Sequence, residues 1–296
     1  MDVSIVLKAM LALSGLALLF GILLAVASIR FHVETDPRVD EVLDVLMGSN
    51  CGACGYPGCQ PAAEAVVAGK ASADVCVAGG TSVAEAVARV MGVEVSVRER
   101  GVALVHCRGG VVESAPKAHY QGIKSCAAAD KIAGGGKACR YGCIGLGTCK
   151  VTCPVSAITM DEDGRRWVDR DRCTGCGLCV EVCPRGLIQV VPRYQEVLVV
   201  CNSRDKGVVS KRLCKVSCIA CRKCEKVCGE NAIRIEDNRA WIDYDACVEC
   251  GDCVEACPTG AIMRVAPPRG RRGKVKPPSE AGWSTAERLA SRGAIE

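Results

Sequence analysis

A run of closely spaced cysteines limits the possible fold of this chain more than any other feature. Residues 173–184 read CTGCGLCVEVCP, so four cysteines are separated by two, two and three residues and a proline follows the last. In this spacing three thiolates bind one cubane iron–sulfur cluster, and the fourth binds a neighbouring cluster. Structural zinc sites usually take their ligands in pairs from two separated knuckles, so zinc fits the run poorly. The run therefore predicts [4Fe–4S] chemistry.

The cysteine content of the whole chain supports this interpretation. There are 24 cysteines among 296 residues, while aromatic side chains make up only 3%. Disulfide frameworks are typical of short secreted chains, whereas runs with two- and three-residue spacing are typical of metal ligation. Cluster assembly needs thiolates, which indicates a reducing compartment. We expect the clusters to organise much of the fold, as a metal does in a small domain.

Near the N-terminus, residues 9–28 contain no charged side chain. About 20 apolar residues are long enough to cross a bilayer, and Lys8 and Arg30 flank the run. A cleaved signal peptide is the alternative because residues 25–27 resemble a cleavage site, but the run is longer than a usual signal core. Flanking basic residues leave the positive-inside rule nearly undecided. The need for reduced thiolates predicts a single span in the cytoplasmic (inner) membrane, with the bulk of the chain on the cytoplasmic side.

A small cysteine module follows this anchor. After apolar residues at helical spacing over 39–47, the chain contains C-x2-C-x4-C between positions 51 and 59, an alanine-rich helical stretch and one further cysteine. Four thiolates are enough for one [4Fe–4S] cluster, and a four-cysteine zinc knuckle is the alternative. The predicted ligands are Cys51, Cys54, Cys59 and Cys76.

Residues 100–192 and 195–268 look like two copies of one plan. Each copy starts with an apolar strand that ends in cysteine, continues through a second lone cysteine, and then carries two ligand runs. Between the runs, Asp163-Gly164 and the weaker Asp237-Asn238 predict tight turns of hairpins. Trp167 and Trp241 follow these turns at equivalent places, and we expect both to be core side chains.

Exchange of the fourth cysteine between the two runs of a copy gives two clusters per copy. The first run of the first copy has x3 and x5 spacing, and Gly229 replaces the usual proline after Cys228, but neither departure removes a ligand. The predicted ligand sets are Cys139, Cys143, Cys149 and Cys183; Cys173, Cys176, Cys179 and Cys153; Cys218, Cys221, Cys224 and Cys257; and Cys247, Cys250, Cys253 and Cys228.

Four cysteines remain after these five clusters, two from each copy. They are Cys107, Cys126, Cys201 and Cys214. We expect them to bind a sixth [4Fe–4S] cluster at the junction of the two copies. Buried free thiols are the alternative, because cysteine also packs as a small hydrophobic residue.

The predicted fold class is α+β, with an N-terminal transmembrane helix, a small four-cysteine [4Fe–4S] module and two tandem 2[4Fe–4S] ferredoxin-like units. The expected divisions are an anchor over 1–30, the module over 35–82, a connector with two lone cysteines over 98–133, the first ferredoxin-like unit over 134–193, a second such connector over 195–217, the second unit over 218–268 and a disordered basic tail over 269–296.

The order of these parts resembles a known family, the B subunits of Rnf-type electron transport complexes. The resemblance rests on the anchor, on NCGACGYPGC at 50–59 with Cys76, and on CRYGCIGLGTC at 139–149 leading into two ferredoxin units. It implies a subunit that relays electrons between soluble ferredoxin and the membrane subunits of the complex. The resemblance also implies that the complex couples ferredoxin and NAD redox chemistry to translocation of Na⁺ or H⁺.

No catalytic residue is predicted in this chain. It has no strand–GxGxxG–helix pattern for a dinucleotide and no nucleophile elbow, and its net charge of +5 comes with no nucleic-acid-binding module. A basic stretch over 206–226 is expected to be a solvated face, which could steer an acidic carrier or face anionic lipid. The rival function is an iron–sulfur subunit of a different oxidoreductase, with substrate at an open iron in a three-cysteine site. A structural or zinc-storage role is the third and weakest alternative.

Overall fold

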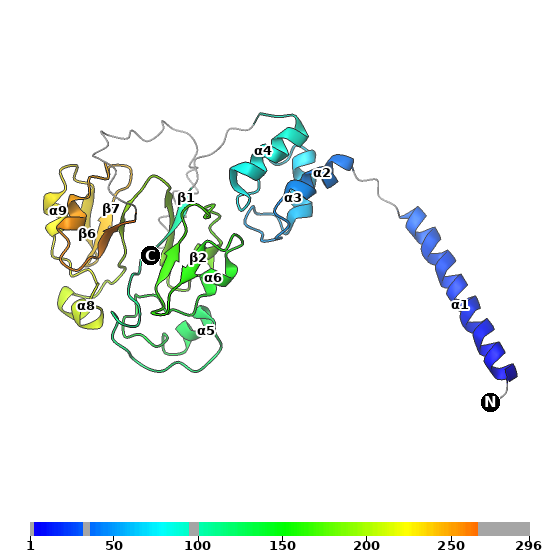
Figure 1. Ribbon diagram of the computed structural model, residues 1–296, viewed down its shortest axis with the longest axis horizontal. Coiled ribbons are helices and arrows are strands. Elements are labelled where there is room, and N and C mark those ends of the chain that lie inside the picture. Colours follow the sequence, from blue (N-terminus) through cyan, green and yellow to red (C-terminus); the bar gives the residue numbers. More distant parts are fainter. Residues whose placement is uncertain (1–2, 32–35, 95–100, 266–296) are drawn as a thin grey trace.

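The computed structural model describes residues 3–31, 36–94 and 101–265, and combines short helices with two-stranded antiparallel sheets. A long helix, a small helical module and a larger part built from two similar units follow one another along the chain (Figure 1). This arrangement agrees with the predicted α+β class. The expected tail over 269–296 lies outside the described residues.

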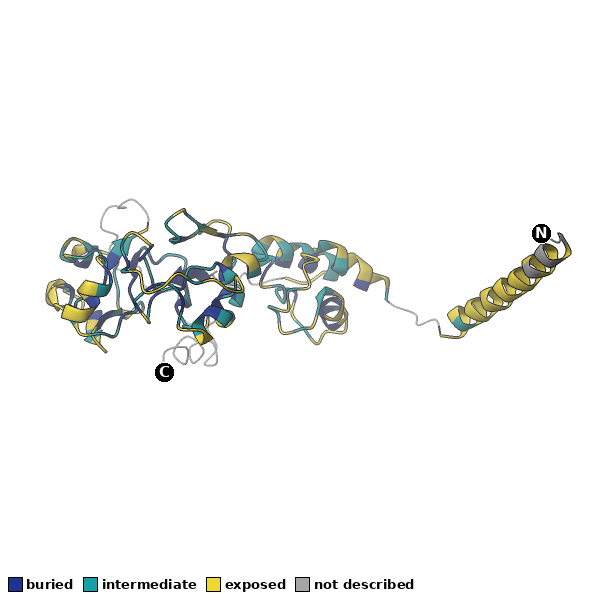
Figure 2. Cartoon of the chain, turned by 90° about the horizontal axis from the view of Figure 1, so that it is seen from below, coloured by how far each residue is buried: buried dark blue, intermediate teal, exposed yellow. Residues whose placement is uncertain are grey.

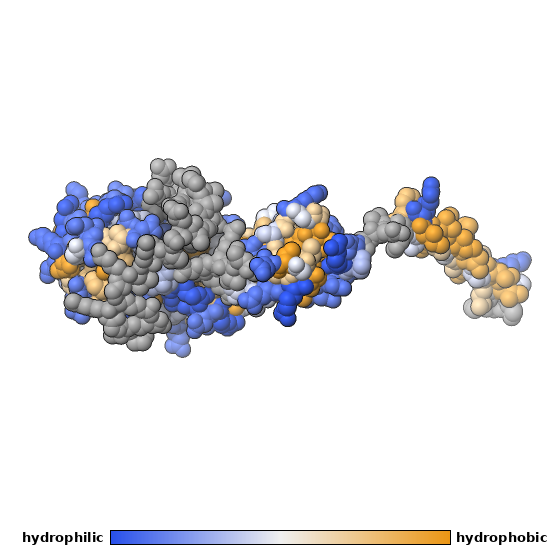
Figure 3. Space-filling model, turned by 90° about the horizontal axis from the view of Figure 1, so that it is seen from above, coloured by the Kyte–Doolittle hydropathy of each residue, from blue (hydrophilic) through white to orange (hydrophobic). Residues whose placement is uncertain are grey.

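Helix α1 spans Val3–Arg30 and stands apart from the rest of the described chain (Figure 1). From Met10 to Arg30 all of its side chains except that of Ala27 are exposed, including Leu13 and Leu24 at 67% and 70% (Figure 2). Figure 3 shows the same helix as a hydrophobic rod. Within the described residues, Met10–Arg30 is the one segment long and apolar enough to cross a membrane. Exposed leucines along a whole helix are expected where lipid rather than protein is the solvent.

Three helices form the small module, and Asp36 caps the first by accepting the backbone N–H of Arg38. They are α2 (Pro37–Val45), α3 (Cys59–Val67) and α4 (Gly80–Met91). Val42 and Ala63 are fully buried in its core, and Val87 of α4 packs with them. The module therefore continues through Met91 rather than ending near residue 82.

The first ferredoxin-like unit is built around two antiparallel strand pairs. Its elements are β1 (Gly101–Val105), α5 (Cys126–Lys131), α6 (Thr148–Thr152), β2 (Ile158–Met160), β3 (Arg166–Val168), α7 (Leu178–Glu181) and β4 (Ile188–Pro192). Strand β1 pairs with β4, and β2 pairs with β3 around the turn that contains Gly164. Every residue of β1 is buried, so the segment expected as a connector is part of the core of this unit.

The second unit repeats this plan. Its elements are β5 (Val197–Val199), α8 (Gly207–Leu213), α9 (Lys223–Val227), β6 (Ile233–Glu236), β7 (Arg239–Ile242), α10 (Asp252–Glu255) and β8 (Ile262–Arg264). Strand β5 pairs with β8 as β1 pairs with β4, and β6 pairs with β7 as β2 pairs with β3. The predicted hairpin turns lie between β2 and β3 and between β6 and β7.

Buried hydrogen bonds join the two units. His106, directly after β1, places Nδ1 2.8 Å from the carbonyl oxygen of Val199 in β5 and Nε2 3.1 Å from the side-chain amide of Gln189 in β4. Burial lowers the pKa of His106, and because the carbonyl of Val199 can only accept, Nδ1–H is the donor of that hydrogen bond. The amide of Gln195 donates to the carbonyl of Tyr244 at 2.9 Å. These buried hydrogen bonds form a polar interface between the two units, which we call the seam.

The prediction that both tryptophans are core residues was wrong for Trp167, which is 47% exposed. In the β2–β3 register Trp167 pairs with Thr159 on the outer face, while Ile158 is buried on the other face. Trp241 is only half-buried, with the guanidinium of Arg239 5.4 Å from its ring centre. A two-stranded ladder has one solvated face, and alternation along the strand places these rings toward it.

Candidate metal centres

The four cysteines of the small module lie together. Cys51, Cys54, Cys59 and Cys76 line a hollow of about 340 Å³ that is partly open to solvent. Gly52 and Gly55 have φ values of +72° and +85°, which lets the loop curl around this space. Asn50 accepts the backbone N–H of Cys59 at 2.8 Å and so fixes the start of α3 against the loop. We call these four cysteines the module group.

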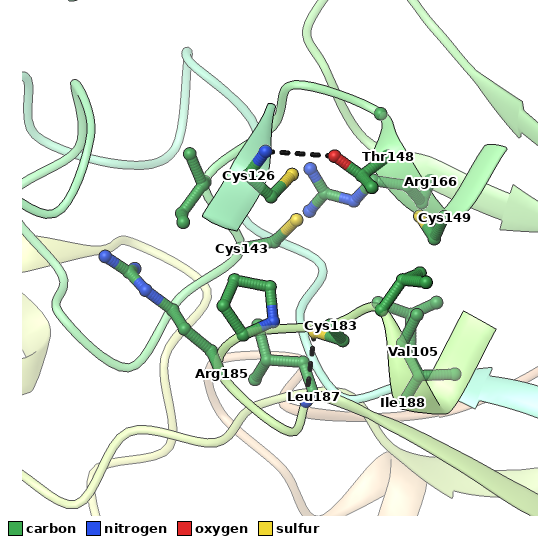
Figure 4. Close-up of a pocket in the computed structure, with 14 residues that line it drawn as sticks. Val105, Cys126, Cys143, Thr148, Cys149, Arg166, Cys183, Arg185, Leu187 and Ile188 are labelled. Atoms are coloured by element: carbon green, nitrogen blue, oxygen red, sulfur yellow. Dashed lines mark hydrogen bonds between the residues drawn. The ribbon is translucent and has the colours of Figure 1, made fainter. Parts of the chain in front are cut away.

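A second hollow, of about 420 Å³, lies in the first ferredoxin-like unit. Cys126, Cys143, Cys149 and Cys183 line it, together with Arg166 (Figure 4). Cys139, which was expected here, is not among the lining residues, and Cys126, which was expected in the sixth set, takes its place. We call Cys126, Cys143, Cys149 and Cys183 the first inner group.

Local hydrogen bonds hold the two distant members of this group. The hydroxyl of Thr148 accepts the backbone N–H of Cys126 at 2.9 Å, which fastens α5 beside α6. The backbone N–H of Leu187 donates to the sulfur of Cys183 at 3.4 Å (Figure 4). Such N–H···S contacts are among the means by which proteins adjust cluster potentials. Burial raises the pKa of Cys143 to about 12, so a metal must displace its proton.

Cys139 instead lies near two of the lone cysteines. It lies within electrostatic reach of Cys107 and Cys214, and Cys201 lies within reach of Cys107. Gly109 allows this approach, since a Cβ there would be 3.1 Å from the sulfur of Cys214 and 4.0 Å from that of Cys107. We call Cys107, Cys139, Cys201 and Cys214 the central group.

The sequence contains a signal that Cys126 and Cys139 exchange places between the two predicted sets, although the prediction did not use it. Cys139 precedes Cys143 by four residues, as Cys214 precedes Cys218. The backbone N–H of Cys143 donates to the sulfur of Cys107 at 3.2 Å, and that of Cys218 donates to Cys201 at 3.2 Å. Cys139 and Cys214 are therefore equivalent, and the first copy has Leu146 where the second has Cys221. Cys126 supplies the missing sulfur from α5.

The remaining cysteines lie near the other members of their predicted sets. Cys179 interacts electrostatically with Cys153, Cys173 and Cys176, and also with Cys149. Cys224 interacts with Cys218, Cys221 and Cys257, and Cys253 interacts with Cys228, Cys247 and Cys250, and also with Cys224. In each set one sulfur comes from the opposite ligand run of its copy, as expected for cross-ligation. We call Cys153, Cys173, Cys176 and Cys179 the first outer group. Cys218, Cys221, Cys224 and Cys257 are the second inner group, and Cys228, Cys247, Cys250 and Cys253 are the second outer group. Burial raises the pKa of Cys179 and Cys253 to about 12.

The spread of the sulfurs fits a multi-iron cluster better than a single ion. Zinc–sulfur bonds of about 2.3 Å would draw four sulfurs around one point. Among the described residues, no three His, Cys, Asp or Glu side chains converge on a position for one ion. The module and first inner groups instead surround hollows. All 24 cysteines are free of disulfides.

Two ferredoxin-like repeats that carry such cysteine groups define a multi-cluster iron–sulfur electron-transfer protein. Family models agree: an "Fe-S cluster" model matches residues 46–78, and "4Fe-4S dicluster domain" models match residues 139–190 and 217–273. The chain belongs to the family of B subunits of ion-translocating oxidoreductase complexes, the iron–sulfur electron-transfer subunits of these membrane assemblies.

Three curated relatives carry this assignment. The B subunit of the Na⁺-translocating ferredoxin:NAD⁺ oxidoreductase complex of Acetobacterium woodii is 47% identical over 246 residues, which are 83% of this chain and 74% of that protein. The B subunit of the ion-translocating oxidoreductase complex of Methanosarcina acetivorans is 39% identical over 259 residues, 88% of this chain and 98% of the relative. The B subunit of the proton-translocating ferredoxin:NAD⁺ oxidoreductase complex of Clostridium ljungdahlii is 40% identical over 263 residues, 88% and 93% of the two chains.

Proposed function

We propose that this chain holds six [4Fe–4S] clusters in one unbranched row and relays electrons between soluble ferredoxin and the membrane subunits of an ion-translocating complex. A bound [4Fe–4S] cluster accepts and releases one electron at a time. The observation that carries the proposal is the proximity of the six cysteine groups, each of which has a cysteine within electrostatic or hydrogen-bonding reach of a cysteine of the following group.

The neighbour relations give the order of the row. The pairs that link successive groups are Cys51 with Cys176, Cys179 with Cys149, Cys143 with Cys107, Cys201 with Cys218, and Cys224 with Cys253. The row therefore runs from the module group through the first outer, first inner, central, second inner and second outer groups. The two ferredoxin-like units face each other across the central group.

The end of the row that lies in the second unit is the more exposed end. Cys221 and Cys250 are the two exposed cysteines, and both lie in the second unit. Arg222, Lys223 and Lys226 are exposed beside them and form no part of the buried core. A basic surface attracts an acidic carrier and orients it during approach. These residues support docking of ferredoxin at the second unit.

The other end of the row is close in sequence to the membrane anchor, since the module begins only a few residues after α1. We place α1 in the cytoplasmic membrane and the cysteine groups on its cytoplasmic side, where thiolates stay reduced. In this orientation the module group faces the membrane subunits. Those subunits couple the electron flow to translocation of Na⁺ or H⁺.

The rival function, substrate binding at an open iron, needs a group with only three cysteines. Each of the six proposed groups has four cysteines, which supports relay over substrate chemistry. The full-length chain, purified in detergent without oxygen, tests the proposal through its iron, sulfide and zinc content and its reduced-state EPR spectrum. We expect about 24 irons per chain, at four per cluster, and reduction of the clusters by reduced ferredoxin. About 20 irons would remove one cluster from the row, and zinc in place of iron would end the electron-transfer function.

A further inference from the structure

Two buried cations lie between the first inner group and the central group. Lys137 is 8% exposed and Arg166 is 7% exposed. Arg166 lines the hollow of the first inner group (Figure 4), and Lys137 lies within electrostatic reach of Cys107, Cys143 and Cys214. The two cationic ends flank Gly145, where a Cβ would be 3.7 Å from Nζ of Lys137 and 3.8 Å from Nη1 of Arg166.

Neither cation has a carboxylate partner in the part of the chain that the structure describes. Nζ of Lys137 donates to the carbonyl of Gly109 at 2.9 Å. The guanidinium of Arg166 donates to the carbonyls of Gly164 and, at 3.5 Å, Cys107, while its Nε is buried without a partner. Two like charges are thus buried together with only neutral acceptors.

The adjacent residue, Arg165, is an arginine whose charge is compensated by carboxylates. Arg165 forms ion pairs with Asp161, Asp163 and Glu113, at 2.8, 2.7 and 3.3 Å. It is also less buried than Arg166, with 30% of its side chain exposed. The chain therefore supplies three carboxylates to the more exposed of two neighbouring arginines and none to the buried one.

An isolated buried charge is strongly unfavourable unless a charge of opposite sign accompanies it. A cluster with four thiolate ligands carries net negative charge and becomes more negative on reduction, so a nearby cation favours the reduced state. We propose that Lys137 and Arg166 are the counter-charges of the first inner and central clusters and hold their reduction potentials above those of the other clusters. This inference rests on the proposed function, because it requires clusters at both groups.

The second unit provides an internal comparison. In the strand register, Arg166 pairs with Met160 and the equivalent Ala240 pairs with Ile235. Ala240 is 2% exposed, so the second inner group has an uncharged wall at this point. The residue equivalent to Lys137 is Arg212, which is exposed to solvent.

Arg239 is the buried cation of the second unit, and it differs from the pair in the first. Its side chain bonds to Asn202, and Arg204, Cys201 and the carboxylates of Asp237 and Glu236 lie within its electrostatic reach. Its Nε, like that of Arg166, is buried without a partner. Arg239 thus has two carboxylates nearby, whereas Lys137 and Arg166 have no carboxylate partner in the described residues. Electrons should therefore collect at the first inner and central groups, which are third and fourth in the row.

The test is an EPR-monitored redox titration of the full-length chain in detergent, with iron counted on each sample. Arg166→Gln and Lys137→Met remove one charge each, and Arg166→Lys and Lys137→Arg keep it. Arg165→Gln is the matched control, since it removes a charge that carboxylates already offset. We expect the neutral variants to lower the midpoints of two components by about 59 mV or more, a tenfold change for a one-electron couple. The charge-keeping variants and the control should leave them near the wild-type values.

Salt dependence provides a second readout. Exposed charges are screened over about 8–10 Å in ordinary buffers, but buried pairs are screened much less. The shift in the neutral variants should therefore persist in concentrated KCl, whereas an indirect effect of surface charge would shrink.

Several outcomes would overturn the inference. One is full iron content with unmoved midpoints in both neutral variants, and another is an equal shift in the charge-keeping variants. If a neutral variant loses iron, retention of iron and midpoints in its charge-keeping partner supports the inference, and loss in both overturns it. A wild-type chain with only about 16 irons would lack both clusters and would first overturn the proposed function.

Discussion

The backbone N–H of Cys143 donates to the sulfur of Cys107 at 3.2 Å, and Cys218 makes the same bond to Cys201 at the same distance. In each case the donor belongs to an inner group and the acceptor to the central group. The pseudo-symmetric halves of the chain therefore meet the central group through one hydrogen bond each. The exchange of Cys126 and Cys139 follows from this symmetry, and it can be tested directly.

Serine substitutions should show which cysteines share a cluster. We expect Cys139→Ser and Cys201→Ser to damage the same central cluster, so the double variant should lose no more iron than the more affected single variant. Cys126→Ser and Cys139→Ser should damage different clusters, so their losses should add, up to about eight irons at four per cluster. Iron analysis and EPR of the anaerobic full-length protein measure both.

The opposite pattern of iron losses would contradict the exchange of Cys126 and Cys139. Additive losses for Cys139→Ser with Cys201→Ser, together with non-additive losses for Cys126→Ser with Cys139→Ser, would return Cys139 to the first inner group. Cys51→Ser serves as the control, because the module group is separate and its loss should add to each of the others.

A backbone contact beneath the first outer group should make one glycine far less replaceable than its neighbour. Gly175 has φ +72° and a Cβ there would lie 2.7 Å from the carbonyl oxygen of Gly101, whereas Gly177 has φ +84° with nothing within 4 Å. Left-handed strain costs about 1–2 kcal/mol for alanine, and overpacking adds about 1–3 kcal/mol. Gly175→Ala should therefore lower the thermal midpoint clearly more than Gly177→Ala.

The second copy shows how a side chain can be accommodated at the equivalent position. Glu249 occupies the place of Gly175 with φ +61°, and its carboxylate accepts the backbone N–H groups of Glu196 and Val197 at 2.8 and 2.7 Å. If Gly175→Ala unfolds at the same temperature as Gly177→Ala, the contact with Gly101 is not limiting.

The seam between the two units should depend on His106. His106→Leu leaves buried hydrogen-bonding groups of Val199 and Gln189 without this partner, which costs about 1–3 kcal/mol for each unsatisfied group. We expect lower stability and faster amide exchange in β5, measured by hydrogen exchange with the iron content checked. The exposed His119 provides the control through His119→Leu. Unchanged exchange in β5 would show that the seam does not need the imidazole.

Local sequence patterns predicted much of this fold. The hairpin turns, the strands that end in cysteine and the first two helices of the module all depend on residues close together in the chain, where spacing and turn chemistry are informative. The exposed position of Trp167 was missed because hydrophobicity does not tell which face of a two-stranded ladder is covered. The share of α4 in the module core was missed because its partners are in α2 and α3.

The cysteine groups, like the fold, could be predicted where their members are close in sequence and not where they are far apart. Ligand runs with regular spacing identified their groups, but Cys126 reaches the first inner group from a separate helix. Only the fold brings α5 beside α6 through Thr148. The four-residue interval before Cys143 and Cys218 was the available clue, and it becomes meaningful once the two copies are aligned.

The N-terminal helix should decide where the protein resides. Removal of residues 1–31 deletes the one segment in the described chain that can cross a membrane, and it leaves the module helices intact. We expect the shortened chain to stay in the supernatant after vesicle flotation with its iron retained, while the full-length chain floats with the vesicles. Flotation of the shortened chain would mean that another surface holds it to lipid.

The composition of the central group has a consequence for biosynthesis. Cys107 and Cys139 leave the ribosome well before Cys201 and Cys214, so the early half of the protein waits with two bare thiols while the later half is still being made. The central group cannot be completed until β5, which precedes Cys201, and α8, which precedes Cys214, have folded against the first unit. A chain released before Cys201 would carry the membrane anchor, the module and the first unit, but it would lack two of the four thiolates of the central group, and no supply of iron and sulfide could complete that group.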